Sequence, residues 1–183
     1  MMRIISGIRR GKKLLTLSGD NTRPTLERVK QAFFNAIQFD IAGREVLDLF
    51  SGSGQLGLEA LSRGATSCWF NDMSKDAVQV IEKNIIACGF EELSQLTCKS
   101  YTECVKMIKS KNFSPSLVFL DPPYGCGMIS ESLRLFQEKE ILLDDALIVC
   151  ESGVDEVIDY DGYQFRKEYK YSDIKVTILQ YKV

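Results

Sequence analysis

The 183-residue sequence contains no histidine. A Ser-His-Asp triad, a Cys-His pair, a histidine zinc site and a histidine general base are therefore excluded. Any chemistry must depend on carboxylates, hydroxyls, backbone groups or a cofactor. The six cysteines include no Cys-x-x-Cys pair. This pattern fits buried thiols in a reducing compartment better than disulfides or a metal site.

Long apolar runs are missing as well. No stretch approaches the roughly 20 apolar residues that span a bilayer, and the basic residues 1–13 are not followed by an apolar signal region. We therefore expect a cytoplasmic protein with no membrane partner. The length and the hydrophobic content of 45% fit one domain with a full core.

Charge is divided unevenly along the chain. Residues 1–30 carry eight Lys and Arg against two acids, a net charge of +6, whereas residues 31–183 carry 15 against 23, a net charge of −8. A basic arm on an acidic body indicates a polyphosphate partner, the alternative being a solvated terminus without a ligand. The candidate phosphate contacts are Arg3, Arg9, Arg10, Lys12, Arg23 and Arg28. Thr25 is a further candidate, but it could equally cap a helix.

Apolar spacing and turn residues predict the order of helices and strands. Short β-like runs at 3–7 and 13–17 predict a small N-terminal hairpin. Further strands are expected at 46–50, 68–72, 93–98, 117–121, 146–151, 163–170 and 175–182, and helices at 26–37, 58–63, 75–88, 102–109 and 129–136. This order predicts an α/β fold, a Rossmann-like doubly wound seven-stranded sheet with a C-terminal antiparallel hairpin. Residues 1–24 would form the basic arm and residues 25–183 the body of one domain.

A glycine-rich loop follows the first strand of this predicted sheet. The loop begins at Ser51, and its spacing Gly52-x-Gly54-x-x-Gly57 matches the dinucleotide fingerprint, which by itself is a weak signal. Glycines let the backbone approach a ligand closely, and the amides at the following helix start face it. Asp48 is a strand carboxylate that needs a cationic partner, such as the α-amino group of S-adenosylmethionine.

Two further acidic residues lie at the ends of later strands of the predicted sheet. Asp72 lies 20 residues beyond Gly52, where a second-strand acid typically holds ribose hydroxyls, although it could instead cap the following helix. Asp121-Pro122-Pro123-Tyr124 follows an apolar strand that the two prolines must end. This group is either a turn with a surface tyrosine or a clamp for a base that carries an exocyclic amine, with the carboxylate and a carbonyl accepting N–H bonds and the ring stacking.

These motifs occur in the order expected of class I S-adenosylmethionine-dependent methyltransferases. The chain more closely resembles the bacterial 16S rRNA guanine-N2 methyltransferase family. The resemblance rests on residues 2–7 (MRIISG), 10–14 (RGKKL), 22–25 (TRPT), 28–30 (RVK) and 46–61, and it extends over essentially the whole chain.

The resemblance implies methyl transfer from S-adenosylmethionine to N2 of one guanine in 16S rRNA or a small-subunit particle, by a monomer. It implies that Asp48 and the 52–57 loop hold the methionine end, Asp72 the ribose, and Asp121 to Tyr124 the flipped base. Three positions depart from the family pattern. Asp72 stands where a Glu is usual, Ser74 stands where an Asp is usual, and Ser100 stands where many relatives have an acid that binds the adenine amine.

Three other functions remain open at this stage. A DNA adenine-N6 methyltransferase could use the Asp-Pro-Pro-Tyr group, but 183 residues leave little room for a target-recognition region. A nicotinamide oxidoreductase would account for the glycine loop alone. A non-catalytic ribosome assembly factor would bind rRNA without using a cofactor.

Overall fold

The computed structural model describes residues 2–17 and 24–182. Its helices are α1 (Pro24–Ala36), α2 (Gln55–Ser62), α3 (Lys75–Cys88), α4 (Tyr101–Ser110) and α5 (Met128–Lys139), with a short 3-10 helix η1 (Glu91–Leu93). Its strands are β1 (Glu45–Asp48), β2 (Ser67–Asp72), β3 (Ser94–Cys98), β4 (Leu117–Leu120), β5 (Leu147–Gly153), β6 (Tyr163–Tyr171) and β7 (Ile174–Tyr181). Within the described ranges, no helix combines the length and apolarity needed to cross a membrane.

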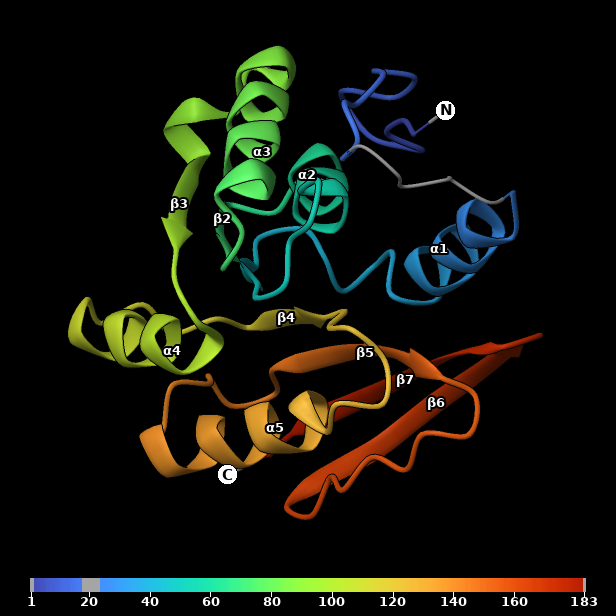
Figure 1. The fold of residues 1–183 in the computed structure, drawn as a ribbon, viewed down its shortest axis with the longest axis vertical. Coiled ribbons are helices and arrows are strands. Elements are labelled where there is room, and N and C mark those ends of the chain that lie inside the picture. Colours follow the sequence, from blue (N-terminus) through green and yellow to red (C-terminus); the bar gives the residue numbers. More distant parts are fainter. Residues whose placement is uncertain (1, 18–23, 183) are drawn as a thin grey trace.

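The seven strands form one sheet in the order β3-β2-β1-β4-β5-β7-β6 (Figure 1). β1 to β5 are parallel, and β7 runs antiparallel between β5 and β6. The predicted doubly wound sheet with a C-terminal antiparallel pair is therefore confirmed. The order reverses between β1 and β4, the place where open α/β sheets bind ligands.

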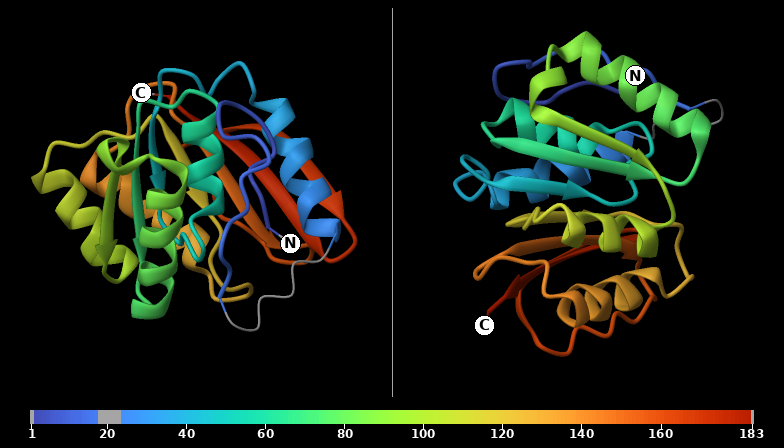
Figure 2. Two further views of the ribbon diagram at one scale, coloured as in Figure 1. Left: turned by 90° about the horizontal axis from the view of Figure 1, so that it is seen from above. Right: turned by 90° about the vertical axis from the view of Figure 1, so that its left-hand side faces the viewer.

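Helices cover both faces of the sheet (Figure 2). Side chains alternate along each strand, so that Val46 of β1 packs in the core cluster with α1, α2 and α3, and its neighbour Leu47 packs in the cluster with α4 and α5. Because both faces are buried, the central strand β4 is apolar throughout, and all four of its residues, Leu117–Leu120, are buried.

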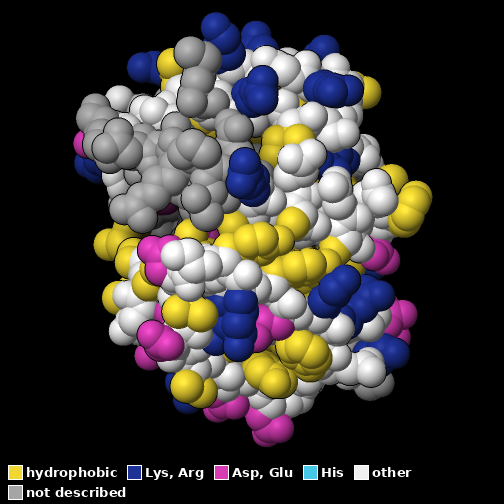
Figure 3. Space-filling view, turned by 90° about the vertical axis from the view of Figure 1, so that its right-hand side faces the viewer, with side chains coloured by type: hydrophobic (Ala, Val, Ile, Leu, Met, Phe, Trp, Pro, Cys, Tyr) yellow, Lys and Arg dark blue, Asp and Glu magenta, His cyan; other side chains and the backbone are white. Residues whose placement is uncertain are grey.

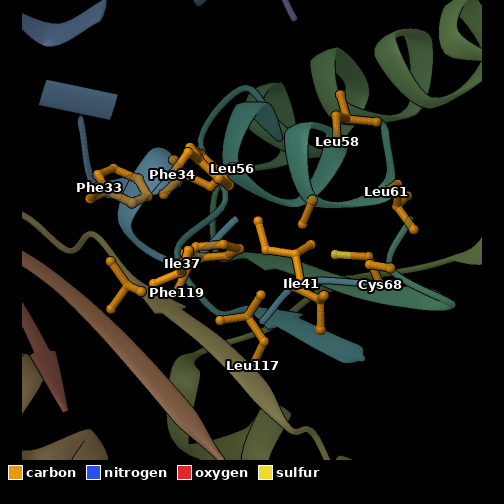
Figure 4. Packing of buried hydrophobic residues seen from close by; sticks show 14 of the residues in the cluster. Phe33, Phe34, Ile37, Ile41, Leu56, Leu58, Leu61, Cys68, Leu117 and Phe119 are labelled. Carbon is orange, nitrogen blue, oxygen red and sulfur yellow. The ribbon is translucent and has the colours of Figure 1, made fainter. Parts of the chain in front are cut away.

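Helix α1 supplies aromatic side chains to the first of these clusters. Its Phe34 ring centroid lies 5.6 Å from that of Phe119 in β4 and 4.6 Å from that of Phe33. Figure 4 shows these rings and Ile37 directed toward the sheet beside Leu56 of α2. This packing fixes α1 against the start of α2, and therefore next to the glycine loop.

Helix α2 differs from its predicted bounds. It begins at Gln55, three residues before the expected start at 58, and β1 ends at Asp48 rather than at 50. All eight residues of α2 are buried, so its sequence carries no apolar stripe from which the first turn could be recognised. Gly54, with φ of 79°, turns the chain directly into the helix. By contrast, α3 occupies the predicted range 75–88.

The N-terminal segment (residues 2–17) forms a small antiparallel hairpin that is shorter than the predicted runs at 3–7 and 13–17. Three backbone hydrogen bonds join residues 2–4 to residues 11–14 around the antiparallel bridge between Arg3 and Lys13. Beyond it, Leu15 exchanges two hydrogen bonds with the side chain of Asn84 in α3. A side-chain amide replaces the partner strand, and strand periodicity could not indicate that exchange.

This N-terminal segment is held on α2. Glu59, 1% exposed, accepts hydrogen bonds from the amides of Ile5 at 2.6 Å and Ser6 at 3.0 Å. A Cβ on Gly7 would lie 1.8 Å from the carbonyl oxygen of Ser62, so only glycine permits this approach. The basic segment is therefore a fixed surface of the domain beside the glycine loop.

Candidate active site

A cleft opens at the carboxyl ends of β1, β2, β4 and β5. It has two adjoining parts, a first of about 390 Å³ and a second of about 500 Å³. Both are lined by Phe50, Gly52, Asp121, Pro122 and Pro123. The Asp-Pro-Pro group therefore stands where the two parts meet, between a site for one ligand and a site for another.

The glycine loop forms the wall on the β1 side. Gly52 and Gly54 have positive φ values of 55° and 79°, which other residues rarely adopt. Gly57 is needed for packing, because a Cβ there would lie 2.3 Å from the ring of Phe70. The Ser51 hydroxyl donates to the carbonyl of Asp48 at 2.7 Å and closes the turn.

Asp48 lies beneath this loop rather than on the cleft wall. It is 1% exposed, and its carboxylate accepts a hydrogen bond from the amide of Gly57 at 3.0 Å. Burial raises the pKa of Asp48 to about 7, against the opposing effect of the nearby Lys30 charge. Asp48, which the sequence indicated as a cofactor-binding residue, is therefore next to the loop, and its carboxylate faces the start of α2.

Lys30 of α1 was not assigned to the site from the sequence. It is 9% exposed, lines the first part of the cleft and donates a hydrogen bond to Oε1 of Gln55. The signal that could have revealed it is a lysine adjacent to Val29 on the apolar face of a predicted helix. A buried ammonium here provides a positive charge close to Asp48.

Asp72 connects the loop to α3. Its Oδ2 accepts from the Gly52 amide at 2.9 Å, and its Oδ1 accepts from the Ser74 amide at 2.9 Å. The alternative that Asp72 itself caps α3 is wrong, because Ser74 is the N-cap and its hydroxyl accepts from Ala77. Asp72 lines the second part of the cleft, which is where a residue that binds the ribose would have to lie.

The rest of the second part is mainly apolar. Its walls include Leu49, Met73, Met128 and Tyr101, whose ring lies 5.8 Å from that of Phe50. A flat heterocycle suits such a slot.

Ser100 also lines this second part, but its side chain is engaged within the protein. It forms a capping box with Glu103 at the start of α4, accepting from the Glu103 amide and donating to Oε2 at 2.8 Å. The hydroxyl also lies 3.2 Å from that of Thr102, so its hydrogen and both of its lone pairs have partners within the protein.

Tyr124 lines the first part of the cleft only. Its side chain is 45% exposed, and its hydroxyl donates to Oε1 of Glu151 at 2.8 Å. Partial burial and the neighbouring carboxylates of Glu151 and Asp121 hold the pKa of Tyr124 well above its usual value. The tyrosine is therefore a neutral donor with a ring at the cleft mouth.

Glu151 was also absent from the sequence-based candidates. It ends the apolar run of β5, is 5% exposed and lines the first part of the cleft. Its position repeats the pattern of Asp48 and Asp121, an acid at the carboxyl end of an apolar strand. That shared pattern was the signal available in the sequence.

Comparison with known proteins places this architecture in a family. The model of the family described as Conserved hypothetical protein 95 matches residues 2–180. The chain belongs to that family. A relative named "Putative rRNA methyltransferase YlbH", from Bacillus subtilis, is 36% identical over 150 residues, covering 82% of each chain. "Ribosomal RNA small subunit methyltransferase D" of Haemophilus influenzae is 35% identical over 172 residues, covering 91% of this chain and 87% of the other.

Solved structures agree with this assignment. The structure named "Putative methyltransferase yhhF from Escherichia coli" matches with a TM-score of 0.87 at 30% identity, covering 100% of this chain and 98% of that one. The resemblance to the rRNA methyltransferase family and the Rossmann-like fold are thereby confirmed.

In this family member, one end of the molecule carries exposed basic side chains with few acids among them. Figure 3 shows many Lys and Arg side chains in the upper part of one face, whereas in its lower half Lys and Arg lie among most of the visible acids. Arg3 and Arg10 line a hollow of about 220 Å³ together with Gln31 of α1. Lys12 and Arg28 are exposed. Arg23 lies outside the described residues, and of Thr25 only its place in the first turn of α1 is described.

Arg9 differs from these neighbours. Its Nε donates to the carbonyl of Cys88 at the end of α3, and its guanidinium lies 5.7 Å from the Phe90 ring centroid. A cation at a helix C-terminus is stabilised by the exposed carbonyls. Arg9 therefore attaches the N-terminal segment to α3, in addition to any contact it makes with RNA.

Proposed function

We propose that this protein transfers the methyl group of S-adenosylmethionine to the exocyclic N2 of a guanine in 16S rRNA. The observation that carries this proposal is the junction of the two parts of the cleft at Asp121 and Pro122. The second part, lined by Gly52 and Asp72, suits the adenosine end of the cofactor, and it adjoins the first part, where Tyr124 completes the predicted base clamp. The names of the relatives refer to methylation of rRNA and of small-subunit rRNA, which supports this class of reaction.

The residues of the cleft fit the cofactor. Asp72 is placed to accept hydrogen bonds from ribose hydroxyls, and the apolar slot between Phe50 and Met128 suits adenine. The backbone of the 52–57 loop and the Lys30 ammonium would hold the methionine carboxylate, since amides at a helix start and a cation both favour an anion. When bound, S-adenosylmethionine supplies a sulfonium methyl and a good leaving group.

The clamp acts on the amine of the base. The lone pair of guanine N2 is delocalised into the ring, so the nitrogen is a poor nucleophile. Asp121 and the Pro122 carbonyl accept its two N–H bonds, which favours a pyramidal nitrogen and directs the lone pair toward the methyl group. Asp121 then receives the proton that N2 must lose. The Tyr124 ring stacks on the base, a contact worth about 1–3 kcal/mol.

The exposed arginines and lysines of the N-terminal segment contact phosphates and so position the RNA without reading its sequence. Removing a guanine from its stack costs a few kcal/mol, so we expect an unpaired or exposed target. We propose that the protein acts as a monomer, and a ribosomal substrate implies a cytoplasmic location.

Mass-spectrometric mapping of methylguanosine in small-subunit rRNA from cells with and without the gene tests the function. One N2-methylguanosine should disappear on deletion and return with the wild-type gene but not with Asp121→Ala. The Asp121→Ala protein should still bind S-adenosylmethionine in calorimetry. An unchanged methylation map, or restoration by Asp121→Ala, would exclude this function. Naked 16S rRNA and small-subunit particles, assayed side by side with purified protein, identify the substrate form.

A further inference from the structure

Glu151 has one carboxylate oxygen that lacks a hydrogen-bond partner among the described residues. Oε1 accepts the hydrogen bond from Tyr124 at 2.8 Å. Oε2 is fully buried, and no donor among the described residues bonds to it. A buried carboxylate oxygen is costly to leave without a hydrogen bond. Because Glu151 lines the cleft, a small rotation of its side chain would bring this oxygen to a donor supplied from outside the chain.

The neighbouring groups do not provide that donor. The Lys30 ammonium lines the same part of the cleft but donates to Gln55. The Tyr124 hydroxyl has a single hydrogen, which it gives to Oε1. The missing donor must therefore come from solvent or from a ligand in the first part of the cleft.

The sheet register places Glu151 beside the base clamp. In the parallel pair β4 and β5, Leu120 is opposite Cys150. Asp121 and Glu151 are the next residues of two adjacent strands, whose backbones run about 4.8 Å apart. Both side chains line the first part of the cleft. Two neighbouring carboxylates thus face one ligand, and they match two neighbouring N–H donors.

We propose that Oε2 of Glu151 accepts the N1–H of the target guanine while Asp121 and Pro122 hold its N2 amine. This inference rests on the proposed function and adds the residue that selects the base. Guanine presents N1–H directly beside N2–H on one edge. Adenine and 2-aminopurine present a bare N1 lone pair at the corresponding place, which a carboxylate repels. Glu151 therefore determines specificity, and Tyr124 fixes the orientation of its carboxylate.

The test uses 2-aminopurine, which keeps the N2 amine but lacks the N1 hydrogen. The mapped target guanosine in a small-subunit RNA is replaced by 2-aminopurine, and kcat/KM is measured on both substrates for wild-type protein and Glu151→Gln. Wild-type protein should prefer guanine by at least about tenfold, the effect of one hydrogen bond to a charged acceptor. In Glu151→Gln the amide N–H can donate to the bare N1, so the preference should fall by about tenfold or more.

The matched control is Glu156→Gln. The Glu156 carboxylate bonds to the Gly125 amide at 2.9 Å and is not part of either cleft wall, so this variant should retain the wild-type preference. Calorimetry with S-adenosylhomocysteine verifies that each variant is folded and keeps its cofactor site.

The outcomes separate the two proposals. An equal loss of activity on both bases in Glu151→Gln would assign Glu151 a merely structural role. Equal methylation of guanine and 2-aminopurine by wild-type protein would overturn the inference without any variant. Either result would leave the proposed methylation of guanine N2 unaffected. If wild-type protein methylates no guanine N2 in the RNA, the proposed function itself fails, and this inference with it.

Discussion

The hydroxyl of Tyr124 donates to Oε1 of Glu151 at 2.8 Å and links the loop after β4 to the end of β5. Because Glu151 is 5% exposed and Tyr124 is 45% exposed, the bond fixes a surface ring to a buried acid. The ring that would stack on a base is therefore positioned before the substrate arrives. Such pre-organisation reduces the cost of ordering the site on binding.

Substitutions at Tyr124 separate stacking from this hydrogen bond. Tyr124→Ala removes the ring, so kcat/KM for the RNA should fall by about 5- to 150-fold, corresponding to the 1–3 kcal/mol of one stacked base. Tyr124→Phe keeps the ring and loses only the bond to Glu151, so its loss should be smaller. Steady-state kinetics on small-subunit RNA give both values. Equal losses of kcat/KM in the two variants would show that stacking by the Tyr124 ring does not contribute to the reaction.

Much of the fold could be predicted from the sequence because the strands and most helices have distinct periodicities. Where periodicity is lacking the prediction fails, as in the uniformly buried α2, which begins at Gln55. The N-terminal hairpin forms but is shorter than predicted, for a related reason. Leu15 bonds to the Asn84 side chain, a contact between residues far apart in the sequence that local pattern does not encode.

For the candidate site, the motifs indicated the loop and the Asp-Pro-Pro-Tyr group, but not the residues opposite them. Lys30 and Glu151 reach the cleft only because α1 packs beside α2 and β5 lies beside β4. Their side chains are charged and buried, a property that depends on the tertiary fold. The sequence showed an acid after an apolar strand, but not which cavity it would enter.

Stability should depend on pH through Asp48. Burial raises its pKa from 3.8 to about 7 in the folded protein, so folding favours the protonated carboxyl. The contribution of Asp48 to stability is therefore fully present below about pH 4 and is lost as the pH rises toward 7. Asp48→Asn, which carries no charge, should have the larger free energy of unfolding at pH 8, by on the order of 1–4 kcal/mol.

Urea unfolding of both proteins between pH 4 and pH 8 checks this expectation. The difference between Asp48→Asn and wild type should shrink steadily toward zero as the pH falls to 4. Asp155→Asn, a change at an exposed acid, serves as the control and should show no such trend. A difference that does not vary with pH would mean that Asp48 ionises as easily in the folded chain as in the unfolded one.

Charge reversal in the N-terminal segment tests the RNA-binding surface. Arg10→Glu with Lys12→Glu removes two exposed cations and should weaken rRNA binding in a manner that depends on salt. If each residue contacts one phosphate, the slope of log K against log salt should become shallower by roughly 1.4–1.8. Arg9 is left unchanged because it bonds to the end of α3.

The control reverses two exposed lysines on the opposite face of the sheet, Lys106 of α4 and Lys111, which directly follows that helix. Filter binding or fluorescence anisotropy at several salt concentrations gives the slopes. Equal slopes for the N-terminal variant and wild type would rule out phosphate contacts at these two positions, whereas the α4 variant should retain the wild-type slope.

Glu59 connects the N-terminal segment to the catalytic domain. Its buried carboxylate accepts the amides of Ile5 and Ser6 and forms an ion pair with Arg63 at 2.6 Å. Glu59→Ala leaves these donors without an acceptor and should lower the free energy of unfolding by about 3–5 kcal/mol. Release of the segment should also expose the bonds after Arg9 and Arg10 to trypsin, with cleavage there preceding cleavage of the sheet. Timed proteolysis followed by mass spectrometry checks this order.

The control is Glu138→Ala, which removes a largely exposed ion pair with Arg134. This variant should change the free energy of unfolding by less than about 1 kcal/mol. Early cleavage at the same sites in wild-type protein would show that Glu59 does not hold the segment in solution.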